Sequence, residues 1–285
     1  MRKTTKGALI VVASAVCWSF SGVLSKNFAW NAFSKAGVRA VVAVFIYAAA
    51  RRSFKVKLTR GTLTGAVGVT ATSLLYMTAL QFTTSANAIV LQYSMPVYVI
   101  ILNYLLFRTK PSIKQIITVP VLLAGVILCC AGENAGAEKL PKAALGNIIG
   151  LISGLTYAFV FIASRMKDAD SVDYTYLGNL LAVLFAASAF FDPAVKADAA
   201  HISDWLLAAA MGVSLGLGYL LLGIGLKYAS PVSAAVLENL EPVLNPVWVF
   251  LIVGERPDTL GLIGCALVLV TVSVYSALPE DGING

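Results

Sequence analysis

The chain has 285 residues, of which 59% are hydrophobic and 12% are charged, and its net charge is +7. A soluble domain usually carries about 25% charged residues, so this composition excludes a soluble globular protein and predicts an integral membrane protein. Nucleic-acid binding is excluded as the reason for the positive charge, because the basic residues cluster between apolar spans, where a membrane orientation signal belongs.

Ten apolar segments follow one another along the chain. They cover 7–26, 33–50, 61–82, 86–107, 114–132, 144–164, 174–191, 204–226, 232–253 and 258–277. Most hold about 20 residues, which matches a hydrocarbon core of about 30 Å if they are helices. Helices are required because lipid offers no partner to backbone polar groups, and a barrel would show shorter alternating segments. The first segment follows a basic start without a small-residue cleavage site, so we interpret it as a retained helix.

The distribution of lysine and arginine predicts the orientation of these spans. With the N-terminus inside, 14 of the 21 basic residues fall on the inner side, six fall in outer loops, and Arg39 lies within the span 33–50. Positive charge accumulates on the cytoplasmic side of membrane proteins. We therefore expect a multi-pass protein of the cell membrane with both termini in the cytoplasm.

A segment of the chain is repeated 146 residues further on. Leu80–Pro111 aligns without a gap with Leu226–Pro257, and the 32 aligned positions include eight identities. The identical pairs include Pro96 with Pro242, each about mid-way along an apolar span. Proline removes a backbone hydrogen bond, so we expect both spans to be loosened at these two hinge positions.

The repeat extends over both halves of the chain. The span 7–26 aligns with 144–164 at an offset of 139, pairing Gly7 with Gly146, Trp18 with Tyr157, and Lys26 with Arg165. Each half holds five spans, and an odd number makes the second half enter the membrane from the opposite side, as in transporters with inverted repeats. The expected units are residues 1–132, an outer linker 133–143, and residues 144–285.

Four short motifs and the paired five-span units carry a family resemblance. The motifs are Cys17-Trp18-Ser19, Met95-Pro96-Val97, Glu241-Pro242-Val243 and Gly254-Glu255. With them the chain resembles the drug/metabolite transporter superfamily, in its ten-helix EamA branch. Thr109 departs from the family pattern, because it stands in the first unit where Glu255 stands in the second. The resemblance implies an all-α protein with ten helices around a central cavity, and the transport of small metabolites, often amino acids and usually outward.

Two acids stand inside the span 232–253. On a continuous helix Glu238 and Glu241 lie about 60° apart, on one face with Asn245. Acids inside a membrane span cost several kcal/mol and usually mark a functional site. We expect at least one of them to bind a cationic or ammonium group of the substrate or to accept a proton. The alternative is a structural ion pair between Arg39 and one glutamate, with Glu238 as the glutamate that stays free.

Other polar and aromatic side chains within the spans are candidates for the wall of the cavity. They are Ser14, Trp18, Ser21, Tyr76, Gln92, Tyr157 and Tyr219. Aromatic rings can form a cage around a quaternary ammonium group or an aromatic side chain. The alternative is helix packing through small residues, or ordinary core and interface packing of the rings. Trp18 and Tyr157 stand at matched positions, so the repeat symmetry predicts that they face each other.

The sequence offers no support for an enzyme, a metal site or a cofactor. Its four cysteines all lie in apolar spans, and its single histidine, His201, lies in a predicted outer loop. A histidine-dependent membrane enzyme is therefore not expected, and we read the cysteines as small hydrophobic residues. No nucleotide-binding motif is present, so the chain itself is not expected to bind ATP.

We therefore predict a secondary transporter that moves a small metabolite or an amino acid by alternating access, most simply as an exporter that can be coupled to protons. An alternative is a carrier of choline-like organic cations that uses the same glutamates and the aromatic cage. A channel or a membrane enzyme is the alternative of another class. The expected partners are the small-molecule substrate and the lipid bilayer, and the expected assembly is a monomer or a weak homodimer.

Overall fold

The computed structural model describes residues 3–25, 30–83, 85–129, 142–197, 201–253 and 259–277. A few side chains inside these ranges, among them those of Ser21 and Asn245, lie outside the described part. The regular structure of the described residues is helical throughout. The helices are α1 (Lys3–Ser25), α2 (Ala32–Arg51), α3 (Arg60–Phe82), α4 (Ser85–Gln92), α5 (Met95–Phe107), α6 (Ile113–Cys129), α7 (Ala143–Ala163), α8 (Ser171–Ala182), the 3-10 helix η3 (Val183–Phe190), α9 (Pro193–Ala197), α10 (Ile202–Gly225), α11 (Pro231–Glu238), α12 (Glu241–Val253) and α13 (Thr259–Ala277).

Six helical stretches among the described residues are long and apolar enough to cross a membrane. They are Ala32–Arg51, Arg60–Phe82, Asn87–Phe107, Ala143–Ala163, Ser171–Phe190 and Ile202–Gly225, and shorter apolar helices cover Thr5–Phe20, Ile113–Leu128 and Thr259–Tyr275. Large apolar side chains such as Phe45 and Phe190 point outward and are exposed. A surface of this kind suits lipid. The all-helical membrane protein is confirmed, and the number of ten crossings stays a prediction.

Two of the predicted spans are broken at their matched prolines. The helix α4 ends at Gln92 and α5 begins at Met95, whereas α11 ends at Glu238 and α12 begins at Glu241. Pro96 and Pro242 are the second residues of α5 and α12, a position where a missing N–H is tolerated. The helix restarts there because proline cannot donate a hydrogen bond to the carbonyl four residues earlier. The weak points that the repeat predicted are therefore breaks in both helices.

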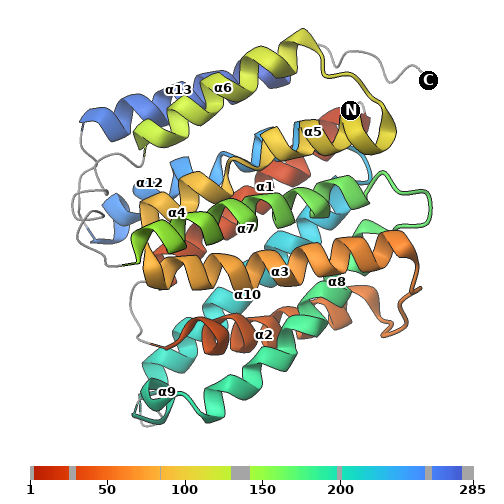
Figure 1. Cartoon of the computed structure of the whole chain (residues 1–285). Coiled ribbons are helices and arrows are strands. Elements are labelled where there is room, and N and C mark those ends of the chain that lie inside the picture. Colours follow the sequence, from red (N-terminus) through yellow and green to blue (C-terminus); the bar gives the residue numbers. More distant parts are fainter. Residues whose placement is uncertain are drawn as a thin grey trace.

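The packing of the helices repeats itself between the two halves. The helix α3 packs against α7 and α8, and α10 packs against α1 and α2, while α6 and α13 lie together along one edge (Figure 1). A Cβ atom on Gly7 would lie 2.8 Å from the Cβ atom of Tyr228, and one on Gly146 would lie 2.8 Å from that of Thr83. At both matched glycines, the first helix of one half touches the chain just beyond the third long helix of the other half.

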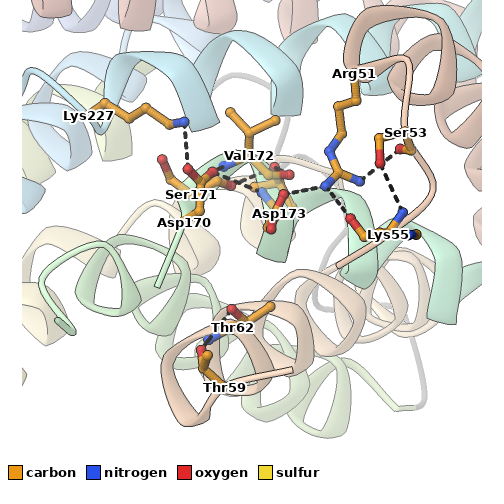
Figure 2. Close-up of polar contacts among 11 residues, drawn as sticks. Arg51, Ser53, Lys55, Thr59, Thr62, Asp170, Ser171, Val172, Asp173 and Lys227 are labelled. Atoms are coloured by element: carbon orange, nitrogen blue, oxygen red, sulfur yellow. Dashed lines mark hydrogen bonds and ion pairs between the residues drawn. The ribbon is translucent and has the colours of Figure 1, made fainter. Parts of the chain in front are cut away.

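Polar contacts tie the helix ends together on the side where α1 begins (Figure 2). Arg51 at the end of α2 forms an ion pair with Asp173 in α8. Asp170 caps the start of α8 by accepting the amide protons of Val172 and Asp173, and it accepts a bond of 2.7 Å from Lys227 beyond α10. Partial burial opposes the ionisation of Asp170, but the Lys227 ammonium and the two amides outweigh it and hold the pKa of this carboxyl below its usual value.

Candidate functional site

A small cavity lies beside the breaks in the two interrupted helices. Its volume is about 60 Å³, which is room for a few water molecules, since one water needs roughly 10–15 Å³ of such space. It draws side chains from α1, α2, α3, α7 and α10, from the α4–α5 break and from α12. The lining residues are Trp18, Arg39, Thr72, Ser73, Tyr76, Gln92, Tyr93, Tyr157, Leu215, Tyr219 and Glu241. We call this space the central cavity.

Three aromatic rings form one wall of the central cavity. The ring of Trp18 meets that of Tyr157 edge-on at a centroid distance of 5.9 Å and that of Tyr219 at 4.8 Å. Edge-on contacts of this kind are favourable between aromatic rings. The indole lies directly against the backbone of α10, because a Cβ atom on Gly218 would be 2.2 Å from its Nε1 atom. Trp18 and Tyr157 therefore meet across the two halves, as their matched positions predicted.

The central cavity carries one cation and one acid. Arg39 is buried and donates from Nη2 to the Ser73 hydroxyl at 2.6 Å, and its Nε has no hydrogen-bond partner among the described residues. Glu241 accepts a hydrogen bond from the Tyr93 hydroxyl. The ion pair with Arg39, which was the alternative to a binding role, is not formed, because among the described residues no nitrogen of Arg39 lies within 4.0 Å of a carboxylate oxygen. The two groups line the same cavity, and each is held by a neutral neighbour.

Glu238 does not share the central cavity with Glu241. It is the last residue of α11, it is fully buried, and neither carboxyl oxygen has a hydrogen-bond partner of normal geometry in the described part of the chain. The Ser14 hydroxyl approaches it but donates to the Gly218 carbonyl at 2.8 Å. The sequence predicted a shared face because it assumed a continuous helix. The break at 239–240 separates the two acids.

The remaining predicted site residues fall into three groups. Tyr76, Gln92, Tyr157 and Tyr219 line the central cavity, as does Trp18. Ser14 joins α1 to α10 through its bond to the Gly218 carbonyl and does not line the cavity. The side chains of Ser21 and Asn245 lie outside the described residues. Of the spans' other polar aromatics, Trp248 donates to the Ser19 hydroxyl at 2.7 Å and stacks on Phe20, away from the cavity.

The sequence-based list of wall residues missed Thr72, Ser73 and Leu215. The repeat contained a signal for Ser73, because an offset of 146 pairs it with Tyr219, which was on that list. Tyr93 also lines the cavity, three residues before Pro96 at the point where the helix breaks. Thr72 and Leu215 are ordinary residues of membrane helices, and only the packing of α3 and α10 brings them to the cavity.

Comparison with known proteins identifies the family. The sequence pattern of the EamA-like transporter family matches residues 5–130 and again residues 144–277. The chain belongs to the EamA-like transporter family. It is similar to an uncharacterized transporter of Archaeoglobus fulgidus, with 31% identity over 204 residues that make up 70% of each chain. It is also similar to the uncharacterized transporter YxxF of Bacillus subtilis, with 25% identity over 184 residues that cover 61% of this chain and 58% of the relative.

A solved crystal structure shows the same fold. It superposes with a TM-score of 0.77 over 95% of this chain and 97% of the other, at 20% sequence identity. At this level of identity the likeness concerns the fold alone. Together with the family match, it supports the description of the chain as a multi-pass membrane protein of a transporter family.

This EamA family member has a second, much larger cavity at the end of the helices where α1 begins. Its volume is about 650 Å³, and we call it the vestibule. Its lining comes from the end of α5 with the loop to α6, from Ser164 and Arg165 after α7, from 226–233 around the start of α11, and from Tyr275. Five of its lining residues are basic, namely Arg108, Lys110, Lys114, Arg165 and Lys227, and none is acidic.

Proposed function

We propose that this EamA family member is a secondary transporter that carries a small zwitterionic metabolite, such as an amino acid, by alternating access. One observation carries the proposal: Arg39 and Glu241, a cation and an acid, line one cavity together with aromatic rings. A guanidinium suits a carboxylate, and a carboxylate suits an ammonium group. A zwitterion presents both groups to such a site.

The inverted repeat is the proposed basis of the alternating-access motion. We propose that the two halves, residues 1–132 and 144–285, are related by an axis in the membrane plane and form a ten-helix basket. The mirrored packing of α3 and α10 supports this relation. An amino acid needs more room than about 60 Å³, so binding requires the broken helices to move. Pro96 and Pro242 are the proposed hinges, because neither proline can donate to the carbonyl four residues earlier and the breaks are bridged by turn bonds such as that from the Leu240 amide to the Leu237 carbonyl.

Glu238 is the proposed proton site. Its carboxyl is fully buried, with no cation paired to it and no hydrogen bond of normal geometry among the described residues, and a charged carboxylate in such a place costs several kcal/mol. Opening of the break at 239–240 would admit water to the carboxyl and let the proton leave. Proton movement would then follow the same motion that exposes the cargo.

A carrier for choline-like cations remains the second candidate, and the aromatic wall favours it. Trp18 meets both Tyr157 and Tyr219 edge-on, and the faces of such rings are the groups that bind a quaternary ammonium ion. The buried guanidinium of Arg39 opposes it, because it repels a cation that has no carboxylate of its own. Stabilisation of the purified protein against heat by choline, but not by amino acids, would favour this candidate.

The setting of the transporter follows from its sequence. We propose that it acts in the cell membrane as an exporter with both termini in the cytoplasm, as a monomer or a weak homodimer. The excess of basic residues on one side of the spans supports this orientation.

Transport by purified protein in liposomes tests the proposed function. A thermal-shift screen of amino acids first selects the cargo, and counterflow of that cargo is then measured for Glu241→Gln, Arg39→Gln and Glu238→Gln. Loss of a hydrogen bond to a charged group is worth about 1.5–3 kcal/mol, so the first two variants should bind the cargo about tenfold or more weakly. Glu238→Gln should still exchange cargo but lose its response to a pH gradient.

A matched control is Tyr104→Phe, which alters an exposed side chain on α5. This variant should transport like the wild type. Counterflow that is unchanged in both Glu241→Gln and Arg39→Gln would refute the zwitterion site. A pH response that survives in Glu238→Gln would refute the proton role alone.

A further inference from the structure

The vestibule has a strongly basic lining. Its basic residues come from three separate connections along the chain: α5 to α6, α7 to α8, and α10 to α11. Lys227 forms an ion pair with Asp170, whereas Arg165 donates to the neutral side chains of Asn103 and Thr109. The vestibule thus concentrates positive charge around about 650 Å³ of space, and such clefts attract anions.

Arg165 is held in a fixed pose inside the vestibule. Its Nη1 atom donates to the Asn103 side-chain oxygen at 2.6 Å and to the Thr109 hydroxyl at 3.0 Å, and its guanidinium lies over the Phe107 ring at 4.8 Å. Both bonds use the same nitrogen, so the Nη2 and Nε edge has no partner among the described residues. A guanidinium oriented in this way can bind a carboxylate or a phosphate through two parallel hydrogen bonds.

Two helices begin at the vestibule and add to its positive potential. Ser112 and Lys114 line it at the start of α6, and Ser230 and Pro231 line it at the start of α11. The N-terminal end of a helix carries a partial positive charge and attracts anions. This contribution adds to the five side-chain cations and has the same sign.

The sequence repeat shows what this site lacks. Arg165 pairs with Lys26 at an offset of 139, and Thr109 pairs with Glu255 at an offset of 146. The second unit therefore provides a carboxylate at the position where the first unit provides the Thr109 hydroxyl. Lys26 and Glu255 lie outside the described residues, so this comparison is one of sequence positions alone. The Thr109 side chain of the first unit is neutral, so its contact with Arg165 does not compensate the charge of the guanidinium.

We propose that the vestibule binds an oxyanion, a carboxylate or a phosphate, with Arg165 as the anchoring residue. The anion is part of the cargo as it is loaded from the predicted cytoplasmic side. Only the role of the anion in cargo loading rests on the proposed transport function. It deepens that function, because a cargo carboxylate that first meets Arg165 is then passed to Arg39 in the central cavity.

The test uses two substitutions at one position. Thr109→Glu places a carboxylate beside Arg165 and introduces the residue type that the second unit has at the matched sequence position, and Thr109→Gln is its neutral match in size. Purified full-length protein in a neutral maltoside detergent is titrated with inorganic phosphate and with succinate, and chloride at equal ionic strength serves as the baseline for the unfolding temperature. Arg165→Gln is measured alongside.

We expect both oxyanions to stabilise the wild type and Thr109→Gln against heat. Half-maximal stabilisation should need an anion concentration about tenfold or more higher in both Thr109→Glu and Arg165→Gln. In Thr109→Glu the new carboxylate occupies the vacant edge of the guanidinium, and in Arg165→Gln the guanidinium itself is removed. An equal response of Thr109→Glu and Thr109→Gln would overturn the proposal, provided that both unfold cooperatively without added anion.

A second arm identifies the source of the anion. The same variants are placed in nanodiscs of phosphatidylcholine, with or without phosphatidylglycerol. If phosphatidylglycerol stabilises the protein through Arg165 and neither soluble anion does, the site is a lipid headgroup site and the loading role is wrong. Glu241→Gln separates the two sites: it should weaken transport and leave the phosphate response intact, so either proposal can fail alone.

Discussion

Gly218→Ala should disturb the central cavity through a single methyl group. The added Cβ atom would lie 2.2 Å from Nε1 and 2.4 Å from Cδ1 of the Trp18 indole, which is far inside van der Waals contact. The indole cannot retreat toward its aromatic neighbours, because the rings of Tyr157 and Tyr219 already pack on it. It must therefore turn into the central cavity, or α10 must move away from α1.

Two opposing terms set the size of the effect. Overpacking in a well-packed interior costs about 1–3 kcal/mol, whereas alanine in a helix interior is favoured over glycine by about 1 kcal/mol. The net loss of stability should therefore be about 0–2 kcal/mol. Cargo binding should suffer more, because an indole that turns inward would fill much of a space of about 60 Å³.

The assay compares Gly218→Ala with Gly150→Ala, the same change on α7. A Cβ atom on Gly150 would meet the Leu91 side chain at 3.1 Å and 3.3 Å and the Ala88 Cα atom at 3.9 Å. Unfolding midpoints and cargo counterflow are measured for both variants. We expect Gly150→Ala to transport normally and Gly218→Ala to lose most of its transport while it remains folded. Normal transport in Gly218→Ala would show that the contact of Trp18 with α10 does not shape the binding site.

Two further predictions concern the end contacts and the broken helices. Asp170→Asn should lower stability by at most about 1 kcal/mol, because its pair with Lys227 is half-exposed. Since the pKa of Asp170 is lowered in the fold, its contribution is present above the pKa of the unfolded chain and is lost as the pH falls through the folded value. Thermal unfolding as a function of pH should therefore show a smaller acid-dependent loss in the variant, and identical profiles would argue against the pair. Pro96→Ala and Pro242→Ala should raise the unfolding midpoint and slow counterflow, because the new N–H groups can bond to the carbonyls of Gln92 and Glu238 and rejoin the helices. Pro120→Ala, at an exposed position inside α6, is the control for restoring a helix hydrogen bond away from the breaks; equal slowing in Pro120→Ala would contradict the hinge role.

Local chemistry made much of the fold predictable. The ten apolar segments could be read from the sequence because lipid forces the backbone of each membrane span to satisfy its own hydrogen bonds. The breaks near residues 93 and 239 followed from Pro96 and Pro242, because a missing N–H acts on its own helix whatever surrounds it. The contact of Trp18 with Tyr157 was predicted from their matched positions in the sequence repeat.

The sequence by itself thus determined the membrane class, the family and the places where two helices are interrupted. Only the tertiary structure decided which polar groups meet. Glu238 and Glu241 belong to different helices because two turn residues lie between them, and Glu238 is fully buried whereas Glu241 lines the central cavity. Arg39 contacts Ser73 rather than an acid, and Arg165 is held by Asn103 and Thr109. Such pairings depend on how each helix is rotated against its neighbours, and that rotation is set by packing between residues far apart in the chain.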